Sequence, residues 1–423
     1  MRTPAGHVTG RETSFKLALL TPQYDRRGGA ESVVETGANA LAQHGLQVSV
    51  FAGSTRESAS PRGPFEFVDE ALFAEARDIV AGPGHRARVR ELANRLSSAQ
   101  IVDMHRTAPV ALLKALRSRV PTMLSLHSSE MTCPAGSRFL VRSGSVCERA
   151  PGPGCLIVDR REQCLTLAEG VPFTWKSRVR ALWRSKLTRR ATSLATMVVF
   201  NSADMKRLFE KHFGSLTMSR VIPPPLRELP PSTPSRQPGR IAIIGRLIEM
   251  KGFADALNAL VRLTGAHLDV YGEGPQRAQL EKTSQQLGVH GRVTFHGWVG
   301  PDDLALALAR ASCLLVPTRG YEAWGMVGPE AIAQGCPVVA YDSGGIREWC
   351  LPRFGTLVPI GNVAALSLAA KDWLARMAAG FDTSSWHSEA HQRWGVPRYV
   401  EQYLEAAHAA MSAFSRGQAR VLP

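Results

Sequence analysis

The sequence predicts an α/β protein with two parallel-sheet domains that face a central cleft, and three observations lead to this prediction. The chain has 423 residues, and this length exceeds what one hydrophobic core usually serves. Of these residues, 44% are hydrophobic, which is enough apolar material for two cores. Short apolar runs alternate with helix-like segments along the chain, as in sheets that carry helices on both faces. A proline-rich stretch divides this alternation into two halves.

Five apolar runs predict the strands of a first domain over residues 15–225. They read "KLALLTP", "QVSVFAG", "IVDMH", "TMLSLH" and "MVVFNS". Parallel strands place their carboxyl ends at one edge of the sheet, where ligands bind at the switch in strand order. We therefore expect His105, His127 and Asn201 to lie near one cleft.

A second domain follows a connector rich in proline. Prolines recur between residues 223 and 238, where they prevent regular structure, so we predict a linker over 226–238. The alternation then restarts with "RIAIIGRL", "HLDVYGEG", "RVTFHGWV", "CLLVPT", "PVVAYDS" and "GTLVPI". These runs predict a second Rossmann-like domain over 239–395, and the apolar spacing of 396–413 predicts a final amphipathic helix.

The composition indicates in which cell compartment the protein works and which kinds of partner it binds. The formal net charge of +15 and the pI near 10.0 favour anionic partners such as nucleotides, nucleic acid or acidic lipid. The chain shows neither aromatic-interleaved basic motifs nor a helix-turn-helix, so we expect no nucleic-acid partner. No window reaches the roughly 18 apolar residues of a membrane span, and the N-terminus does not resemble a signal peptide. Together with seven cysteines that fit reduced thiols, this predicts a cytoplasmic protein.

The stretch from Trp175 to Arg190 combines basic and apolar residues at helical spacing. It reads "WKSRVRALWRSKLTRR" and contains no acidic residue. One interpretation is a helix that lies on the anionic inner face of a membrane and makes the protein peripheral. The other is a domain helix that buries its apolar stripe against a sheet and leaves its charges in water.

Two short segments carry residues suited to binding phosphate. Gly28 and Gly29 precede a helix-like run, so they either present backbone amides to an anion or form an ordinary turn. Arg246 and Lys251 follow the first strand of the second domain. Two cations at such a connection can hold a diphosphate and stabilise the charge that develops as it departs.

Two glutamates stand in the apolar segment "GYEAWGMVGPEAIAQGCPVVAYDSGG". Glu322 lies in a predicted loop, and Glu330 lies in the helix that follows, with seven residues between them. Carboxylates at these places can accept hydrogen bonds from sugar hydroxyls. An acidic first helical turn, favoured by the helix dipole, would also explain Glu330.

Taken together, the motifs resemble those of the family-4 retaining glycosyltransferases, which have the GT-B fold and an E-x7-E motif. The matching segments are "GGAE", "GRLIEMKG", "YGEGP", "FHGWV", "EAWGMVGPEAIAQGCPVVA" and "GGIRE". They occur in the family's order and extend from about Phe15 to the final helix. The resemblance implies two Rossmann-like domains and a C-terminal helix that packs back on the first of them.

The resemblance also implies roles for individual residues. His127 and Glu322 would border the donor sugar, and Glu330 would bind the ribose of the nucleotide. Arg246 and Lys251 would grip the donor diphosphate, with the glycine loop and two backbone amides beside it, and a tryptophan would contact the base. The residues of this donor site are Gly28, Gly29, Arg246, Lys251, Trp298, Glu322, Met326, Val327 and Glu330, and the catalytic ones are His127, Glu322, Arg246 and Lys251.

The implied reaction transfers a hexose from a nucleotide-diphosphate sugar to a glycan or lipid-linked acceptor, with retention, in bacterial cell-envelope polysaccharide biosynthesis. In this family, the leaving phosphate oxygen accepts the acceptor's proton on the same face of the sugar. No cofactor or catalytic metal is expected, since the cations at Arg246 and Lys251 replace it. The alternatives are a nucleotide-sugar epimerase and a non-catalytic sugar-nucleotide-binding protein of the same fold.

Four cysteines form a group of their own in the first domain. Cys133, Cys147, Cys155 and Cys164 lie within about thirty residues, close enough in sequence to bind a structural zinc tetrahedrally. They lack a C-x2-C pair, so reduced structural thiols are the alternative.

Overall fold

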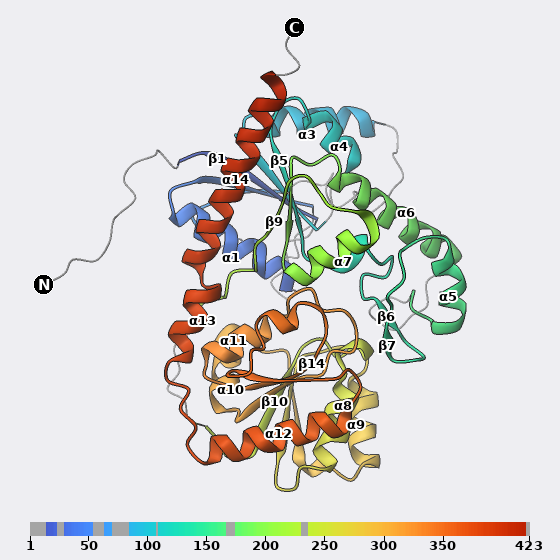
Figure 1. The fold of residues 1–423 in the computed structure, drawn as a ribbon, viewed down its shortest axis with the longest axis vertical. Coiled ribbons are helices and arrows are strands. Elements are labelled where there is room, and N and C mark those ends of the chain that lie inside the picture. The colour runs from blue at the N-terminus through green and yellow to red at the C-terminus, as the bar shows by residue number, and fades with distance from the viewer. Residues whose placement is uncertain are drawn as a thin grey trace, which may run out of the picture.

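The computed structural model describes residues 14–22, 29–53, 63–69, 84–106, 109–165, 174–229 and 236–419. It consists of two α/β domains, one above the other in Figure 1, and the C-terminal helix runs along the upper domain. Gly28 and residues 230–235 of the predicted linker lie outside the described residues.

The N-terminal domain contains a parallel sheet of seven strands in the order β3-β2-β1-β4-β5-β8-β9. Its strands are β1 (Lys16–Thr21), β2 (Gln47–Ala52), β3 (Glu66–Asp69), β4 (Ile101–His105), β5 (Thr122–Leu126), β8 (Met197–Phe200) and β9 (Ser219–Val221). The helices are α1 (Gly29–Gln43), α3 (His85–Leu96), α4 (Val110–Leu116) and α7 (Ala203–Phe213). The five predicted strands are confirmed, whereas β3 and β9 were missed because short edge strands show little apolar pattern.

A side lobe is inserted between β5 and β8. It contains a 3₁₀ turn η1 (Ser129–Met131), a hairpin of β6 (Phe139–Leu140) and β7 (Ser145–Val146), and the helices α5 (Gly154–Glu162) and α6 (Trp175–Thr192). In Figure 1 the hairpin and α5 project from the side of the molecule. The sequence predicted only α6 of these elements.

The C-terminal domain repeats the same plan with six parallel strands in the order β12-β11-β10-β13-β14-β15. Its strands are β10 (Arg240–Ile244), β11 (His267–Tyr271), β12 (Val293–Gly297), β13 (Cys313–Val316), β14 (Val338–Tyr341) and β15 (Gly355–Val358). Its helices are α8 (Phe253–Val261), α9 (Arg277–Gln286), α10 (Pro301–Arg310), α11 (Val327–Ala333), α12 (Val363–Ala378) and α13 (Trp386–Trp394), with 3₁₀ turns η2 (Glu249–Lys251), η3 (His290–Arg292) and η4 (Gly344–Glu348).

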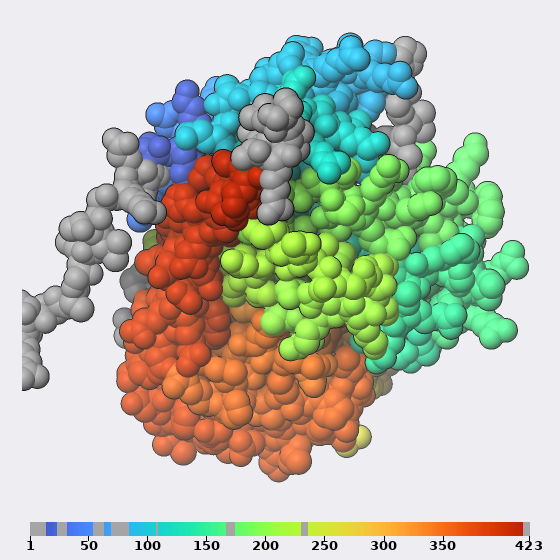
Figure 2. Space-filling model, turned by 45° about the horizontal axis from the view of Figure 1, so that its top comes forward, coloured from blue at the N-terminus to red at the C-terminus, as the bar shows by residue number. Residues whose placement is uncertain are grey.

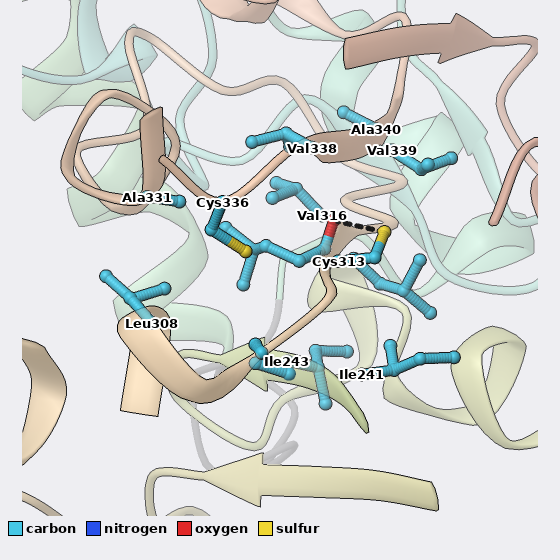
Figure 3. Close-up of a cluster of buried hydrophobic side chains, with 14 of the residues drawn as sticks. Ile241, Ile243, Leu308, Cys313, Val316, Ala331, Cys336, Val338, Val339 and Ala340 are labelled. Atoms are coloured by element: carbon cyan, nitrogen blue, oxygen red, sulfur yellow. Dashed lines mark hydrogen bonds between the residues drawn. The ribbon is translucent and has the colours of Figure 1, made fainter. Parts of the chain in front are cut away.

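Each sheet has the strand order of a doubly wound α/β domain, with a switch point between its first and fourth strands. Figure 3 shows the core of the C-terminal domain, to which the adjacent strands β10, β13 and β14 contribute Ile241, Cys313 and Val338. All seven cysteines lie in the described part of the chain and are free. Leu226 and Leu229, inside the predicted linker, are buried in this core, and the domain limits drawn from the sequence remain predictions.

The last helix, α14 (Val396–Ala419), continues beyond the predicted end at residue 413 and packs on the N-terminal domain. Tyr399 and Tyr403 are buried there among apolar residues of β1 and α1. Gly37 of α1 makes the close approach possible, because a Cβ at this position would lie 2.8 Å from the Tyr399 hydroxyl. In Figure 2 the red C-terminal segment lies beside the N-terminal domain and meets the orange C-terminal domain below it, and the yellow-green segment that includes α7 rests on the orange surface.

Candidate active site

The three residues predicted to share a cleft in the N-terminal domain do meet. His105 ends β4, while His127 and Asn201 follow β5 and β8. His105 Nδ1 lies 2.8 Å from His127 Nε2, and Asn201 Nδ2 lies 3.2 Å from His127 Nδ1. Together with Tyr399 and other side chains they line one pocket at the carboxyl edge of the sheet.

A buried carboxylate stands behind this pair of histidines. Asp103 Oδ2 lies 3.3 Å from His105 Nε2 and accepts a hydrogen bond from Tyr403 of α14 at 2.9 Å. Ser125 donates to Asp103 Oδ1 at 2.9 Å. Burial alone would raise the pKa of Asp103, but His105, Ser125 and Tyr403 outweigh it and lower the pKa below its ordinary value. Sequence reasoning missed Asp103, because an acid inside a strand run carries no distinguishing pattern.

In the C-terminal domain, the structure brings Lys251 and Glu322 together. Lys251 ends η2 after β10, and its Nζ lies 2.5 Å from Glu322 Oε2. Gly252, with φ +69°, closes this turn against the next loop, because a Cβ there would lie 1.9 Å from the Pro317 carbonyl oxygen. Arg246, predicted as the second cation, is exposed on the same connection after β10.

The loop that carries Glu322 is anchored by a buried network. Arg319 forms two hydrogen bonds of 2.7 Å with the carboxylate of Asp255 on α8, and Tyr341 donates to the same carboxylate at 2.9 Å. A bidentate arginine pair of this kind is strong and directional. The position of Glu322 therefore depends on Arg319 and Asp255, neither of which the sequence identified.

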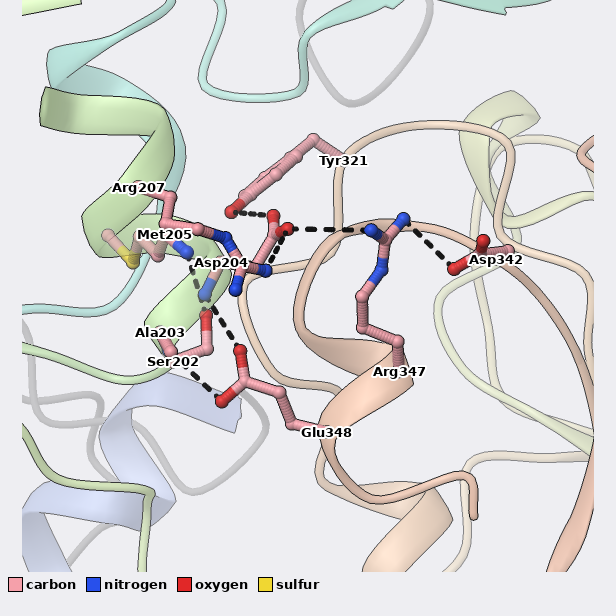
Figure 4. Close-up of polar contacts among 9 residues, drawn as sticks. All are labelled: Ser202, Ala203, Asp204, Met205, Arg207, Tyr321, Asp342, Arg347 and Glu348. Atoms are coloured by element: carbon pink, nitrogen blue, oxygen red, sulfur yellow. Dashed lines mark hydrogen bonds and ion pairs between the residues drawn. The ribbon is translucent and has the colours of Figure 1, made fainter. Parts of the chain in front are cut away.

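Figure 4 shows the polar contacts that join the two domains beside these residues. Tyr321, the neighbour of Glu322, donates to Asp204 at 2.9 Å, and Asp204 is the second residue of α7, which follows Asn201 closely. Glu348 of η4 accepts hydrogen bonds from the backbone amides of Ala203 and Asp204 at 3.0 and 2.8 Å. The carboxyl edge of one sheet thus lies against that of the other.

Glu330 is 3% exposed and is paired with a residue that sequence reasoning missed. Arg227, which follows β9, donates to Glu330 Oε1 from Nε at 3.1 Å and from Nη2 at 2.7 Å. Burial raises the pKa of Glu330, while the charge and hydrogen bonds of Arg227 act in the opposite direction. The ribose contact predicted for this carboxylate remains a prediction.

Three of the remaining predicted donor-site residues fall on two connections. Met326 precedes α11 and Val327 begins it, both half-buried, while Trp298 is 56% exposed after β12. Gly29 is the first residue of α1. Gly328 lets α11 pack against Trp349, because a Cβ there would come within 2.1 Å of the indole ring.

The four cysteines of the side lobe line one cavity, together with Arg138 and Phe139. Burial raises the pKa of the Cys164 thiol to about 12, and the neighbouring Cys133 adds to the rise. Across the described ranges, no three His, Cys, Asp or Glu side chains are arranged to hold a metal ion. The zinc prediction therefore rests on the gathering of the four thiols alone.

Helix α6 only partly buries the stripe that the sequence predicted. The residues that it buries are Ala181, Ser185, Thr188, Ala191 and Thr192. Trp175 and Trp183, which belong to the predicted stripe, are 61% and 51% exposed. The interpretation of α6 as a domain helix holds in part, since α6 packs on α4 and η1 and half-buries Val179, Leu182 and Leu187, but the two indoles of the stripe remain exposed. Among the described helices, none is long and apolar enough to cross a membrane.

Family models match both halves of the chain. Residues 27–227 match the model of glycosyltransferase family 4, and residues 228–379 match that of glycosyl transferases group 1. A lipopolysaccharide core biosynthesis glycosyltransferase of Rhizobium meliloti is 37% identical over 31% of this chain and 38% of its own length. A 2-deoxystreptamine N-acetyl-D-glucosaminyltransferase of Streptomyces fradiae is 27% identical over 78% of this chain and 82% of its own length.

The fold recurs in solved structures. The crystal structure of Anabaena HepE in complex with UDP and glucose has a TM-score of 0.65 at 17% identity, covering 93% of this chain and 100% of that one. Three of the curated relatives match over only 28% to 38% of their own length. The two matched domains and the shared fold show that the chain belongs to the GT-B glycosyltransferases, with a family 4 domain followed by a group 1 domain.

Proposed function

We propose that the chain is a retaining hexosyltransferase that uses a nucleotide-diphosphate sugar and acts on a glycan or lipid-linked acceptor in bacterial cell-envelope polysaccharide biosynthesis. The observation that carries the proposal is the position of the Lys251–Glu322 pair, whose loop meets α7 next to Asn201 and the His127 pocket. HepE, which was solved with UDP and glucose, supports the class of donor. The lipopolysaccharide enzyme of Rhizobium meliloti supports the envelope role.

The chemistry assigns a part to each side of the site. Departure of a nucleotide diphosphate leaves negative charge on the phosphate and positive charge on the sugar, so cations and amides stabilise the transition state. Arg246 and Lys251 supply the cations, and the amides of Met326 and Val327 lie on the neighbouring connection. Glu322 holds Lys251 in place and faces the sugar, while Glu330 accepts from the ribose and Trp298 contacts the base.

The retaining course follows from the same-face mechanism implied by the resemblance. The leaving phosphate oxygen takes the proton of the acceptor hydroxyl, so no side chain has to act as base. His127 agrees with this, because burial lowers its pKa well below the ordinary value and both ring nitrogens have partners within the protein. It borders the sugar as a neutral group.

The first test is a thermal-shift screen of the chain against UDP-, GDP-, ADP- and dTDP-sugars, since a ligand that binds the folded state raises the melting temperature. The stabilising donor is then incubated with lipid-linked and free glycan acceptors, and NMR follows the anomer formed. An inverted anomer contradicts retention. Isomerisation of the donor without acceptor would indicate an epimerase, and binding without any turnover would indicate a non-catalytic protein.

A pair of lysine variants tests the site itself. Lys251→Ala should lower kcat by about 10²–10³-fold, the usual effect of removing one stabilising group for developing charge. Lys282→Ala removes the same charge from an exposed position on α9 and serves as control. Near-normal turnover in Lys251→Ala would refute the assignment of this lysine to the diphosphate.

Contact of α6 with an anionic membrane surface is part of the same proposal. Its exposed indoles, Trp175 and Trp183, lie on a helix that carries basic and no acidic residues, which suits insertion at a headgroup layer. Sedimentation with vesicles of anionic phospholipid should show binding that weakens with salt. Replacing both indoles by alanine should reduce binding, and binding that is equal with neutral vesicles would contradict the proposal.

A further inference from the structure

A row of polar side chains runs from the C-terminal helix to the rim of the site. Tyr403 of α14 donates to the buried Asp103, whose Oδ2 faces His105 Nε2 at 3.3 Å. His105 Nδ1 in turn faces His127 Nε2 at 2.8 Å. The two imidazole planes are nearly parallel, with an interplanar angle of 9° and centroids 5.0 Å apart, as for rings joined edge to edge.

The chemistry of these groups determines which atom donates and which accepts in each contact of the row. A neutral imidazole has one nitrogen that donates and one that accepts, while a carboxylate only accepts. Asp103 already accepts from the hydroxyls of Ser125 and Tyr403, so the nitrogen of His105 that faces it, Nε2, has to carry a proton. When His105 is neutral, its other nitrogen accepts, and His127 has to donate from Nε2.

The contact between His127 and Asn201 agrees with this assignment of donors and acceptors. With its proton on Nε2, His127 presents a lone pair at Nδ1, and the amide nitrogen of Asn201 lies 3.2 Å from it and donates to it. The opposite direction would place a lone pair of His105 against the Asp103 carboxylate. Two acceptor atoms 3.3 Å apart in a buried site repel each other and leave both without a donor, which disfavours that arrangement by about tenfold or more.

We propose that Asp103 is a positioning residue, which holds the proton of His127 on Nε2 through His105, with Tyr403 fixing the carboxylate from the C-terminal helix. The inference rests on the proposed function insofar as His127 borders the donor sugar. Both nitrogens of His127 are occupied inside the protein, so the ring offers the sugar a fixed, non-titrating edge. While these hydrogen bonds are intact, His127 neither donates a proton to the substrates nor accepts one from them.

The direct test reads the tautomers by 15N NMR of the full chain with labelled histidine. His105→Gln and His127→Gln assign the two signals. We expect the wild-type protein to carry the proton of both rings on Nε2. Asp103→Asn keeps the shape but removes the charge, and it should redistribute the proton of His127 between the two nitrogens. Ser125→Ala, which removes one donor from the same carboxylate but leaves its charge, should not change either tautomer.

A His127 protonated on Nδ1 in the wild type overturns the proposal, as does an Asp103→Asn spectrum equal to that of the wild type. If Asp103→Asn does not fold, the tautomers of the wild-type protein alone still test the proposal. In the transfer assay, Asp103→Asn should lower kcat about tenfold or more with little change in the KM of the donor. Absence of any transfer by the wild type would refute the proposed function and leave the tautomer result standing.

Discussion

Glu348 offers a sharp test of how the two halves of the site are held together. It belongs to η4 in the C-terminal domain, yet its carboxylate accepts from the amides of Ala203 and Asp204, the first two residues of α7 in the N-terminal domain. The third amide, Met205, donates to the Ser202 hydroxyl. Because the first amides of a helix have no partner within it, Glu348 acts as a capping group supplied by the other domain.

The magnitude follows from these contacts. Removing the acceptor at a helix N-terminus costs about 0.5–2 kcal/mol, and the loss of a negative charge there adds about 0.3–1 kcal/mol. Glu348 is half-buried, so we expect Glu348→Ala to weaken the interface by about 1–2 kcal/mol. That corresponds to a shift of about fivefold to thirtyfold in the equilibrium between joined and separated domains.

Amide hydrogen exchange measures this shift directly. In Glu348→Ala, the amides of Ala203 and Asp204 should exchange about fivefold to thirtyfold faster than in the wild type. Asp372→Ala is the control, because Asp372 is an exposed acidic residue of the same domain that pairs with Arg376 within α12. Equal exchange in the two variants would refute the view that Glu348 caps α7 across the interface.

The other predictions concern a second ion pair, a histidine and the side lobe. Arg227→Ala leaves the carboxylate of Glu330 buried without its partner, so the donor KM should rise about tenfold or more, and an unchanged KM in steady-state kinetics would contradict a donor role for this pair. Burial lowers the pKa of His127 in the folded chain, whereas the unfolded chain binds the proton near pH 6.5. The unfolding free energy of the wild type relative to His127→Gln should therefore be constant above that pH and fall by about 1.4 kcal/mol for each pH unit below it. Urea titrations over a range of pH measure this difference. A difference that does not depend on pH would contradict a buried neutral ring. Metal analysis tests the two interpretations of the side-lobe cysteines: no three described side chains are arranged to hold a metal ion, so we expect no zinc and four free thiols, and about one zinc per chain that is lost in Cys133→Ser would contradict this.

The local pattern of apolar residues predicted most of the strands and the residues that follow them. The apolar runs that precede His105, His127 and Asn201 are strands, and the three residues meet because parallel strands end at one edge. The same reasoning placed Lys251 and Glu322 on loops of one sheet, and the structure joins them. It held only in part for α6, since helical spacing identifies a stripe but not the side of the helix that will be buried.

The sequence by itself determined the two parallel sheets and the residue types at their carboxyl edges, because strand periodicity and the glycines and charges that follow each strand are local properties. Only the tertiary structure decided which of these residues work in pairs. Arg227 reaches Glu330 across 103 positions of the chain, and Tyr403 reaches Asp103 across 300. Such partners leave no periodic trace, since a hydrogen bond depends on two atoms that meet in space and places no requirement on the residues between them.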